Sequence, residues 1–258
     1  ARAWRQMGST LLGLRRDEEA LAAMRRALEL APEDPGVLAS MGRALFIAQG
    51  RFREAASYFE QALEREPRAG WFALQLAHCL ALLGDLGPAE DMARRAVHLQ
   101  EASLSGQEGF VIVGSHMRLG HVAALQGRDT EAVDLFQREL AFLQRVDHAL
   151  RGRISIELHL RLGTAHRKLG QVEPARAALE TARAAFETRL RLGADDPFTR
   201  YYAAGIYAQL GDTDEALACL EKAVETRGAL TVARARLDPL LEPLREEPRF
   251  RALIQETE

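Results

Sequence analysis

The 258-residue sequence contains little of several residue types, and each shortage excludes a class of protein. Its 2 cysteines, Cys79 and Cys219, lie far apart and cannot form a disulfide framework. It has 9 Pro, 10 Phe, 4 Tyr and 2 Trp against recurring Ala, Leu, Glu and Arg, which favours helices and argues against an all-β fold. No apolar run reaches the roughly 20 residues of a membrane span, and the N-terminus lacks a signal peptide's apolar stretch.

The sequence also lacks a large excess of positive or negative charge. The 34 basic and 37 acidic residues give a net charge of -3, so the sequence lacks the electrostatic footprint that nucleic-acid binding requires. Only Lys168 and Lys222 are lysine, a bias that we attribute to a GC-rich bacterial genome. Because two thiols fit a reducing compartment, we expect a cytoplasmic protein. The chain starts with Ala rather than Met, so we expect a trimmed or processed piece from which a targeting segment or an upstream domain can be missing.

What the sequence does contain is an internal repeat, seen in three series of small residues. All three series advance by the same steps of 34 or 35 residues at first and of 41 to 43 residues later. The first series is Gly8, Gly42, Ala77, Gly120, Gly163 and Ala204; the second is Ala20, Ala55, Ala89, Ala132, Ala175 and Ala216; the third is Ala27, Ala62, Ala96, Glu139, Ala182 and Ala223. Only Glu139 interrupts the small residues of the third series.

Each repeat predicts two antiparallel helices. The small residue of the first series lets the second helix approach the first closely, and the alanines of the other two series share one face of that second helix. A glycine between the helices suits the left-handed backbone that ends a helix. These glycines are Gly50, Gly84, Gly127, Gly170 and Gly211, and the second repeat has one extra residue before Gly50.

The residues that carry the pattern in the first repeat are Trp4, Met7, Gly8, Leu11, Ala20, Met24, Ala27 and Pro32. This pattern resembles the tetratricopeptide repeat at every signature position except the mid-repeat glycine, which is Arg15. The resemblance implies an all-α, right-handed solenoid of stacked helix pairs. We expect six units at about 1–34, 35–69, 70–112, 113–155, 156–196 and 197–228, followed by a C-terminal capping segment at 229–258.

The later units are longer, and their extra residues follow the second helix. Residues 140–151 and 184–192 remain helix-like, so we expect lengthened second helices there, whereas 101–109 is typical of a loop. The last segment, with the sequence LDPLLEPLREEPRF, also resembles the C-terminal end of repeat arrays in bacterial multidomain proteins.

The sequence motifs predict no catalytic residue, no metal site and no cofactor. The sequence has no glycine-rich phosphate loop, HExxH motif, metal-spaced Cys pair or nucleophile elbow. His159 and His166 share a helical face, but their repeat positions are packing positions. Cys79 and Cys219 fall beside core positions and are expected to be buried.

The candidate site comes from the resemblance, which implies that positions 2, 5, 9 and 12 of each first helix line a concave groove. On this register we select thirteen candidate partner-binding residues: Arg2, Arg5, Arg43, Phe46, Trp71, Leu74, His78, Met117, His121, Leu160, Arg167, Phe198 and Tyr201. Aromatic anchors and Arg forks suit an extended or helical partner segment with acidic and apolar residues. The competing interpretation is that the aromatic rings pack against adjacent repeats and the arginines are ordinary solvated charges.

The sequence therefore predicts a non-enzymatic protein-interaction module that binds a peptide or segment of a partner. Two alternatives remain open. The chain can be the regulatory or substrate-docking region of a larger bacterial enzyme, or a scaffold that self-assembles. The identity of the partner and the oligomeric state are not predicted.

Overall fold

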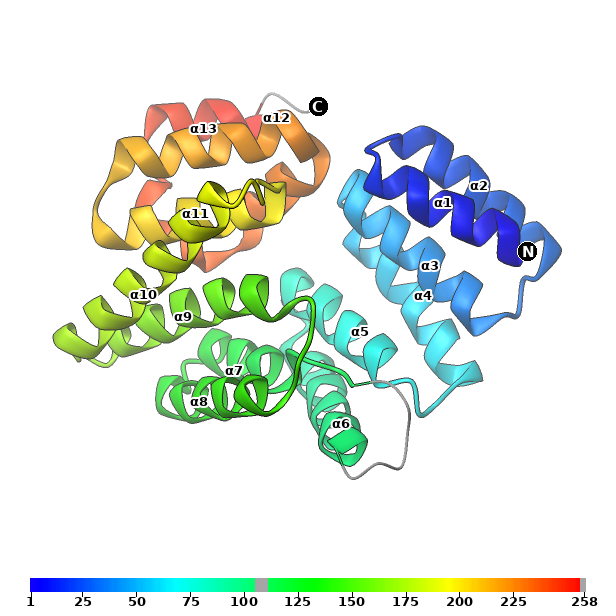
Figure 1. Ribbon diagram of the computed structural model, residues 1–258, viewed down its shortest axis with the longest axis horizontal. Helices are drawn as coiled ribbons and strands as arrows, with labels where there is room; N and C mark the ends of the chain where they lie inside the picture. Colours follow the sequence, from blue (N-terminus) through cyan, green and yellow to red (C-terminus); the bar gives the residue numbers. More distant parts are fainter. Residues whose placement is uncertain (105–110, 256–258) are drawn as a thin grey trace. The chain divides into compact units, whose positions relative to one another are not determined.

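The computed structural model describes residues 1–104 and 111–255, and over these ranges the regular elements are all helical (Figure 1). This confirms the predicted fold class. The helices form successive pairs: α1 (Arg2–Gly13) with α2 (Asp17–Leu30), α3 (Pro35–Ala44) with α4 (Phe52–Arg65), α5 (Gly70–Leu83) with α6 (Leu86–Leu104), α7 (Ser115–Leu125) with α8 (Asp129–Arg145), α9 (Arg151–Lys168) with α10 (Val172–Arg191), and α11 (Pro197–Leu210) with α12 (Thr213–Leu237). A short 3₁₀ helix, η2 (Pro239–Leu244), and α13 (Pro248–Gln255) follow.

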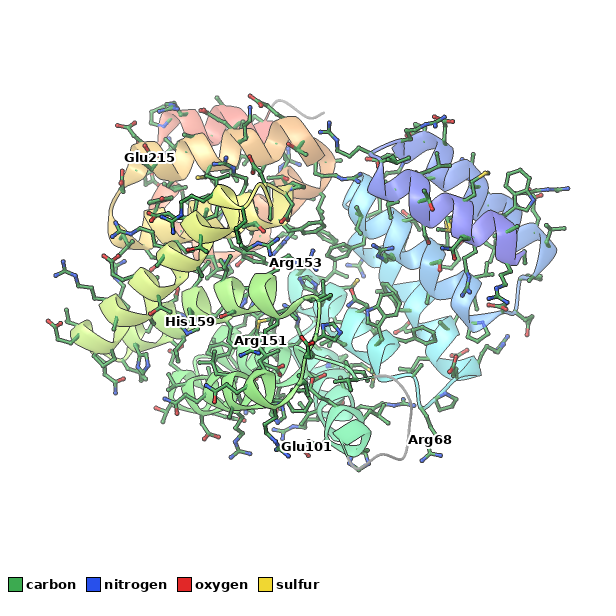
Figure 2. The ribbon with its side chains drawn as sticks, viewed as in Figure 1. Arg68, Glu101, Arg151, Arg153, His159 and Glu215 are labelled. Carbon is green, nitrogen blue, oxygen red and sulfur yellow. The ribbon has the colours of Figure 1, made fainter. Side chains whose placement is uncertain are left out.

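The chain divides into two compact units, Ala1–Ile112 and Val113–Glu258. In unit 1, each helix packs on its pair partner and the second helix of one pair also packs on the first helix of the next. The same stacking continues from α7 to α12 in unit 2. Charged side chains such as Arg68, Glu101 and Glu215 are exposed and stand out from the ribbon (Figure 2).

The helices of a pair touch through backbone at the small residue of the first helix, as predicted. A Cβ placed on Gly42 would lie 3.0 Å from the carbonyl oxygen of Ala55, and a Cβ on Gly163 would lie 3.1 Å from that of Ala175. Such contacts are closer than a side chain normally permits, so only glycine allows this approach without a shift of the neighbouring atoms.

The turns between paired helices also follow the sequence. The five predicted turn glycines all have a left-handed backbone, with φ between 63° at Gly50 and 86° at Gly211. In the first repeat the same conformation falls on Arg15, whose φ is 62°. The extra residue of the second repeat is taken up by a π-helical turn, η1 (Leu45–Gln49), which continues α3. A π-helix holds one more residue per hydrogen-bonded turn, so the insertion leaves Gly50 at the end of the helix.

The observed lengths of the second helices in the later repeats agree only in part with the prediction. Helix α10 continues to Arg191, as predicted for 184–192. Helix α8 instead ends at Arg145, so the prediction that 140–151 is helical is wrong for residues 146–150, and Arg151 already belongs to α9. Val146 is extended, and the His148 ring accepts a hydrogen bond of 3.1 Å from the Leu150 amide just before α9 begins. The extra length therefore belongs partly to the front of α9. The loop expected at 101–109 starts as helix up to Leu104, and its residues 105–109 lie outside the described ranges.

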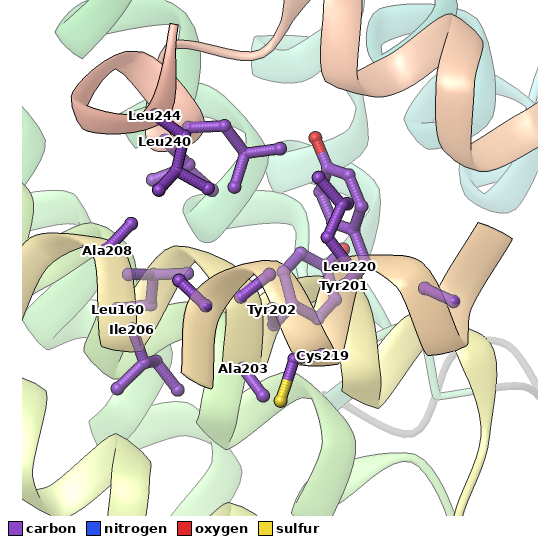
Figure 3. Packing of buried hydrophobic residues seen from close by; sticks show 14 of the residues in the cluster. Leu160, Tyr201, Tyr202, Ala203, Ile206, Ala208, Cys219, Leu220, Leu240 and Leu244 are labelled. Atoms are coloured by element: carbon purple, nitrogen blue, oxygen red, sulfur yellow. The ribbon is translucent and has the colours of Figure 1, made fainter. Parts of the chain in front are cut away.

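The C-terminal segment turns back on the last repeats. Helix α12 is broken at Arg227, which has φ of −144° and ψ of 61°. Beyond it, η2 packs on α11, and Asp238 lies near Arg161 of α9. Leu240 and Leu244 of η2 are buried and point toward the helices that carry Leu160 and Ala208 (Figure 3). Helix α13 packs on α12 and buries Phe250.

Candidate functional site

Some of the residues predicted to line the groove in unit 1 are accessible to solvent. Arg2 and Arg43 are exposed, and Arg5 and Trp71 are half-buried. The Arg5 guanidinium lies against Gly36 in the first turn of α3, at a place where a side chain on residue 36 would collide with it. The first helices of the first two repeats, α1 and α3, are thus in contact through Arg5, at positions predicted to line the groove.

The aromatic residues of unit 1 are mostly packing residues. The Phe46 ring is buried, with its centroid 5.0 Å from that of Phe52 and 5.1 Å from that of His78. It therefore packs inward and is not an open anchor for a partner, contrary to the prediction. Trp71 packs edge-on against Phe59, with centroids 5.8 Å apart, and presents only part of its ring. Leu74 and His78 are buried as well.

In unit 2 the chain's own residues 228–244 cover Leu160 and Tyr201, two of the four residues predicted to line the groove in the last two repeats. The Arg234 guanidinium carbon lies 4.2 Å from the centroid of the Tyr201 ring. The Gln209 side chain donates a hydrogen bond of 3.2 Å to the Leu240 carbonyl oxygen. A Cβ on Gly205 would meet both Leu160 and Leu240. The prediction of an open groove at these repeats is therefore corrected: a segment remote in sequence occupies it.

The predicted residues in unit 2 differ in their exposure. Leu160 and Tyr201 are 0% and 2% exposed, so neither is accessible to a partner in this conformation. Met117 and His121 are buried in α7, whereas Phe198 is half-buried beside Arg153. Arg167 is exposed and donates a hydrogen bond of 2.6 Å to the Gln209 carbonyl oxygen.

A buried charged cluster lies under this segment and was not predicted. Arg161 Nε donates to Glu157 Oε1 at 2.9 Å, and Arg118 Nη2 lies 3.8 Å from the same oxygen. Asp238 Oδ2 lies 3.8 Å from Arg161 Nη2 and 3.7 Å from Arg234 Nη2. Burial alone raises the pKa of Glu157, but the guanidinium groups of Arg161, Arg118 and Arg234 outweigh it and lower this pKa to about 2.

His121 joins the cluster as a neutral ring. Burial, followed by the charges of Arg161 and Arg118, lowers its pKa well below the ordinary value. Arg118 Nη1 lies 3.0 Å from His121 Nδ1. Because arginine can only donate, Nδ1 is the acceptor and carries no proton.

Glu139, the one residue that interrupts the third series, has a structural role. Its side chain is fully buried and accepts hydrogen bonds from the amides of Gly114 at 2.7 Å and His116 at 2.9 Å. A carboxylate at this place satisfies free amides at the start of α7 and is favoured by the helix dipole. The broken alanine series was the signal in the sequence that could have located it.

The described ranges contain no group of three His, Cys, Asp or Glu side chains placed to hold a metal ion. Cys79 and Cys219 are buried, as predicted, and neither takes part in a disulfide. His159 hydrogen bonds to the Ser155 carbonyl oxygen at 2.8 Å. None of the described helices combines the length and hydropathy of a membrane span.

The fold defines a protein built of stacked helix pairs, and sequence comparison identifies the repeat. Four sequence families, each described as a tetratricopeptide repeat, match residues 1–68, 46–102, 157–187 and 201–229. The chain therefore belongs to the tetratricopeptide repeat proteins. No curated protein sequence matches it significantly.

Solved structures of the same fold are similar over most of the chain. PilF of Pseudomonas aeruginosa matches with a TM-score of 0.57 and 15% identity over 95% of this chain and 96% of that one. A tetratricopeptide repeat protein from Parabacteroides merdae has a TM-score of 0.59 and 13% identity, covering 93% and 82%. Cut9, in the Cut9-Hcn1 complex of the APC/C, has a TM-score of 0.63 and 17% identity over 98% of this chain and 42% of that one. At these identities the likeness shows the fold alone. The repeats themselves support a general role in protein interaction.

Proposed function

We propose that the chain is a non-enzymatic interaction module that binds an acidic and apolar partner segment on the inner positions of α1, α3 and α5. The observation that carries this proposal is the contrast between the two units. Arg2 and Arg43 are exposed in unit 1, whereas Leu160 and Tyr201 in unit 2 lie under residues 228–244. Accessible predicted positions are concentrated in unit 1, although Arg167 of unit 2 is exposed as well.

The chemistry of these positions sets the kind of partner. A guanidinium group binds a carboxylate through two parallel hydrogen bonds, so Arg2 and Arg43 favour Asp or Glu side chains. The exposed part of the Trp71 ring adds an apolar contact, and tryptophan is enriched among residues that dominate binding energy. A short segment with acidic and apolar residues meets both requirements, in an extended or a helical conformation.

Selection from a random peptide library displayed on phage tests the proposal. Peptides selected by the full chain should be enriched in acidic and apolar residues. A variant with Arg2→Glu and Arg43→Glu should bind them at least about tenfold more weakly, since each lost charged contact costs roughly 1 kcal/mol or more. The matched control is Arg25→Glu with Arg53→Glu, which changes the net charge equally at exposed residues of the second helices. Equal loss in both variants, or no acidic enrichment, would overturn the proposal.

A further inference from the structure

Unit 2 contains a small cavity between α7, α8, α9 and the start of η2. Its volume is about 50 Å³, which exceeds the roughly 10–15 Å³ that one water needs. Apolar side chains that include Leu125, Phe136 and Leu240 form part of the wall. The charged and titratable residues in the wall are His121, Asp129, Arg161, Lys168 and Asp238.

Two ion pairs in this wall are too long for a direct hydrogen bond. Arg161 Nη2 and Asp238 Oδ2 are 3.8 Å apart, on side chains that are 4% and 0% exposed, and neither atom has a hydrogen-bond partner. Lys168 Nζ and Asp129 Oδ1 are also 3.8 Å apart, and this Asp129 oxygen has no hydrogen-bond partner either. Buried polar atoms of this kind are normally satisfied, so Arg161 Nη2 offers an unused donor to a ligand, whereas the two aspartate oxygens are acceptors that solvent rather than an anion satisfies.

The charge balance favours an anion. Two further arginines lie behind the wall. Arg118 faces the carboxylate of Glu157, and Arg234 faces that of Asp238. Together with the two pairs of the wall, these groups amount to four cations against three carboxylates, and His121 is neutral. An uncompensated buried charge is costly.

We propose that this cavity binds a short-chain monocarboxylate. Its carboxylate accepts hydrogen bonds from Arg161 Nη2 and from the Lys168 ammonium group and supplies the missing negative charge. Its alkyl group contacts Leu125, Phe136 and Leu240. The roughly 50 Å³ of the cavity accommodates a ligand of a few heavy atoms, such as acetate or propionate. This site belongs to unit 2 and is independent of the interaction face proposed for unit 1.

Titration of the full chain with propionate, followed by amide chemical shifts in NMR spectra, tests the site. We expect saturable shifts in α7 and α9 with a Kd of about 1 mM or below. Propionamide has the same shape without the charge and should bind at least about tenfold more weakly. Lys168→Gln, at an exposed residue, should weaken propionate binding several-fold without affecting folding.

Two matched substitutions locate the binding. Ala124→Leu places a larger side chain in the cavity wall and should abolish binding, whereas Ala177→Leu, at an exposed position of α10 outside the cavity, should not. Equal binding of propionate and propionamide, or unchanged binding in both the Lys168→Gln and Ala124→Leu variants, would refute the site. N-acetyl-alanylalanine carries the same carboxylate at the end of a peptide. Tighter binding of this dipeptide would assign the site to a peptide terminus and overturn the assignment to a free acid.

Discussion

At the scale of single residues, Arg15 carries local backbone strain. Among the described residues it is the only one other than glycine with a positive φ, at 62°. A left-handed backbone costs a residue with a Cβ roughly 1–2 kcal/mol relative to glycine. The first repeat keeps its turn despite this cost because α1 and α2 pack together on either side of it.

Arg15→Gly should therefore stabilise the protein. We expect an increase in the free energy of unfolding of about 1 kcal/mol, measured by urea denaturation, because glycine adopts this conformation without strain. Arg15→Ala is the control, since it removes the exposed guanidinium group but keeps the Cβ. A gain of the same size for alanine would show that charge rather than backbone geometry is responsible.

The carboxyl group of Glu157 should give the protein an acid-sensitive component of stability. Its pKa falls from 4.5 to about 2 on folding, so the unfolded chain takes up this proton first. The stabilisation is fully present above the unfolded-state pKa and is lost as the pH falls from about 4.5 to about 2. Its size is on the order of 3 kcal/mol.

Glu157→Gln should be less stable than the wild-type chain at pH 7, because three guanidinium groups lose one of their carboxylates, and the difference should shrink toward pH 2. Chemical denaturation at a series of pH values measures it. Glu225→Gln removes an exposed carboxylate that pairs with Lys222 and should leave the pH profile unchanged. A constant difference between Glu157→Gln and wild type at all pH values would contradict the assignment.

At the scale of elements, two glycines of α9 should respond to alanine in opposite directions. A Cβ on Gly163 would lie 2.7 Å from Leu179 Cγ, so Gly163→Ala should push α9 and α10 apart and cost about 1–3 kcal/mol. A Cβ on Gly152 meets only Arg189 Nη1, at 3.5 Å, so Gly152→Ala should add about 0.5 kcal/mol through helix propensity. Thermal denaturation of both variants measures the contrast. Equal losses of stability in both variants would mean that the cost at Gly163 does not come from its close contact with α10.

The repeat made the elements predictable, because its small residues and turn glycines act locally. Gly42 and Gly84 have the contacts and the backbone that their positions in the repeat require. The end of α8 is not predicted by helix propensity because the competing turn has its own hydrogen bonds. The Leu150 amide donates to the His148 ring, and the Arg151 amide donates to the His148 carbonyl oxygen.

The candidate site was less predictable because it depends on distant residues. An arginine such as Arg161 on a helical segment is normally solvated, and nothing in the sequence pairs it with Asp238. The burial of Tyr201 likewise comes from Arg234, beyond the break in α12. Trp71 also packs on Phe59, so truncation of this residue should lower stability as well as binding. The arginine pair of α1 and α3 is the cleaner test of the interaction face.

At the scale of the whole molecule, the two compact units should lose structure separately. Phe59 is 1% exposed in unit 1, and Phe59→Ala should cost about 3–5 kcal/mol. Stability in stacked repeats is largely a sum of neighbouring contacts, so the loss should stay near the substitution. Amide hydrogen exchange should show reduced protection in α3 to α5 and unchanged protection in α9 to α12.

Ile206→Ala provides the reciprocal measurement, since Ile206 is fully buried in unit 2. Its effect should be confined to α9 to α12 and η2. If either substitution lowers protection equally in both units, the chain unfolds as one cooperative body.

The C-terminal segment also restricts how this array can change by duplication. Asp238 faces Arg161 on α9, while the Leu240 carbonyl oxygen receives the hydrogen bond from Gln209 on α11. A helix pair inserted between α10 and α11 would separate these two anchoring points by one repeat, and the segment could no longer reach both. The fifth and sixth repeats are thus bound to remain neighbours, so in homologous proteins that retain this segment, insertions of whole repeats should fall before α9.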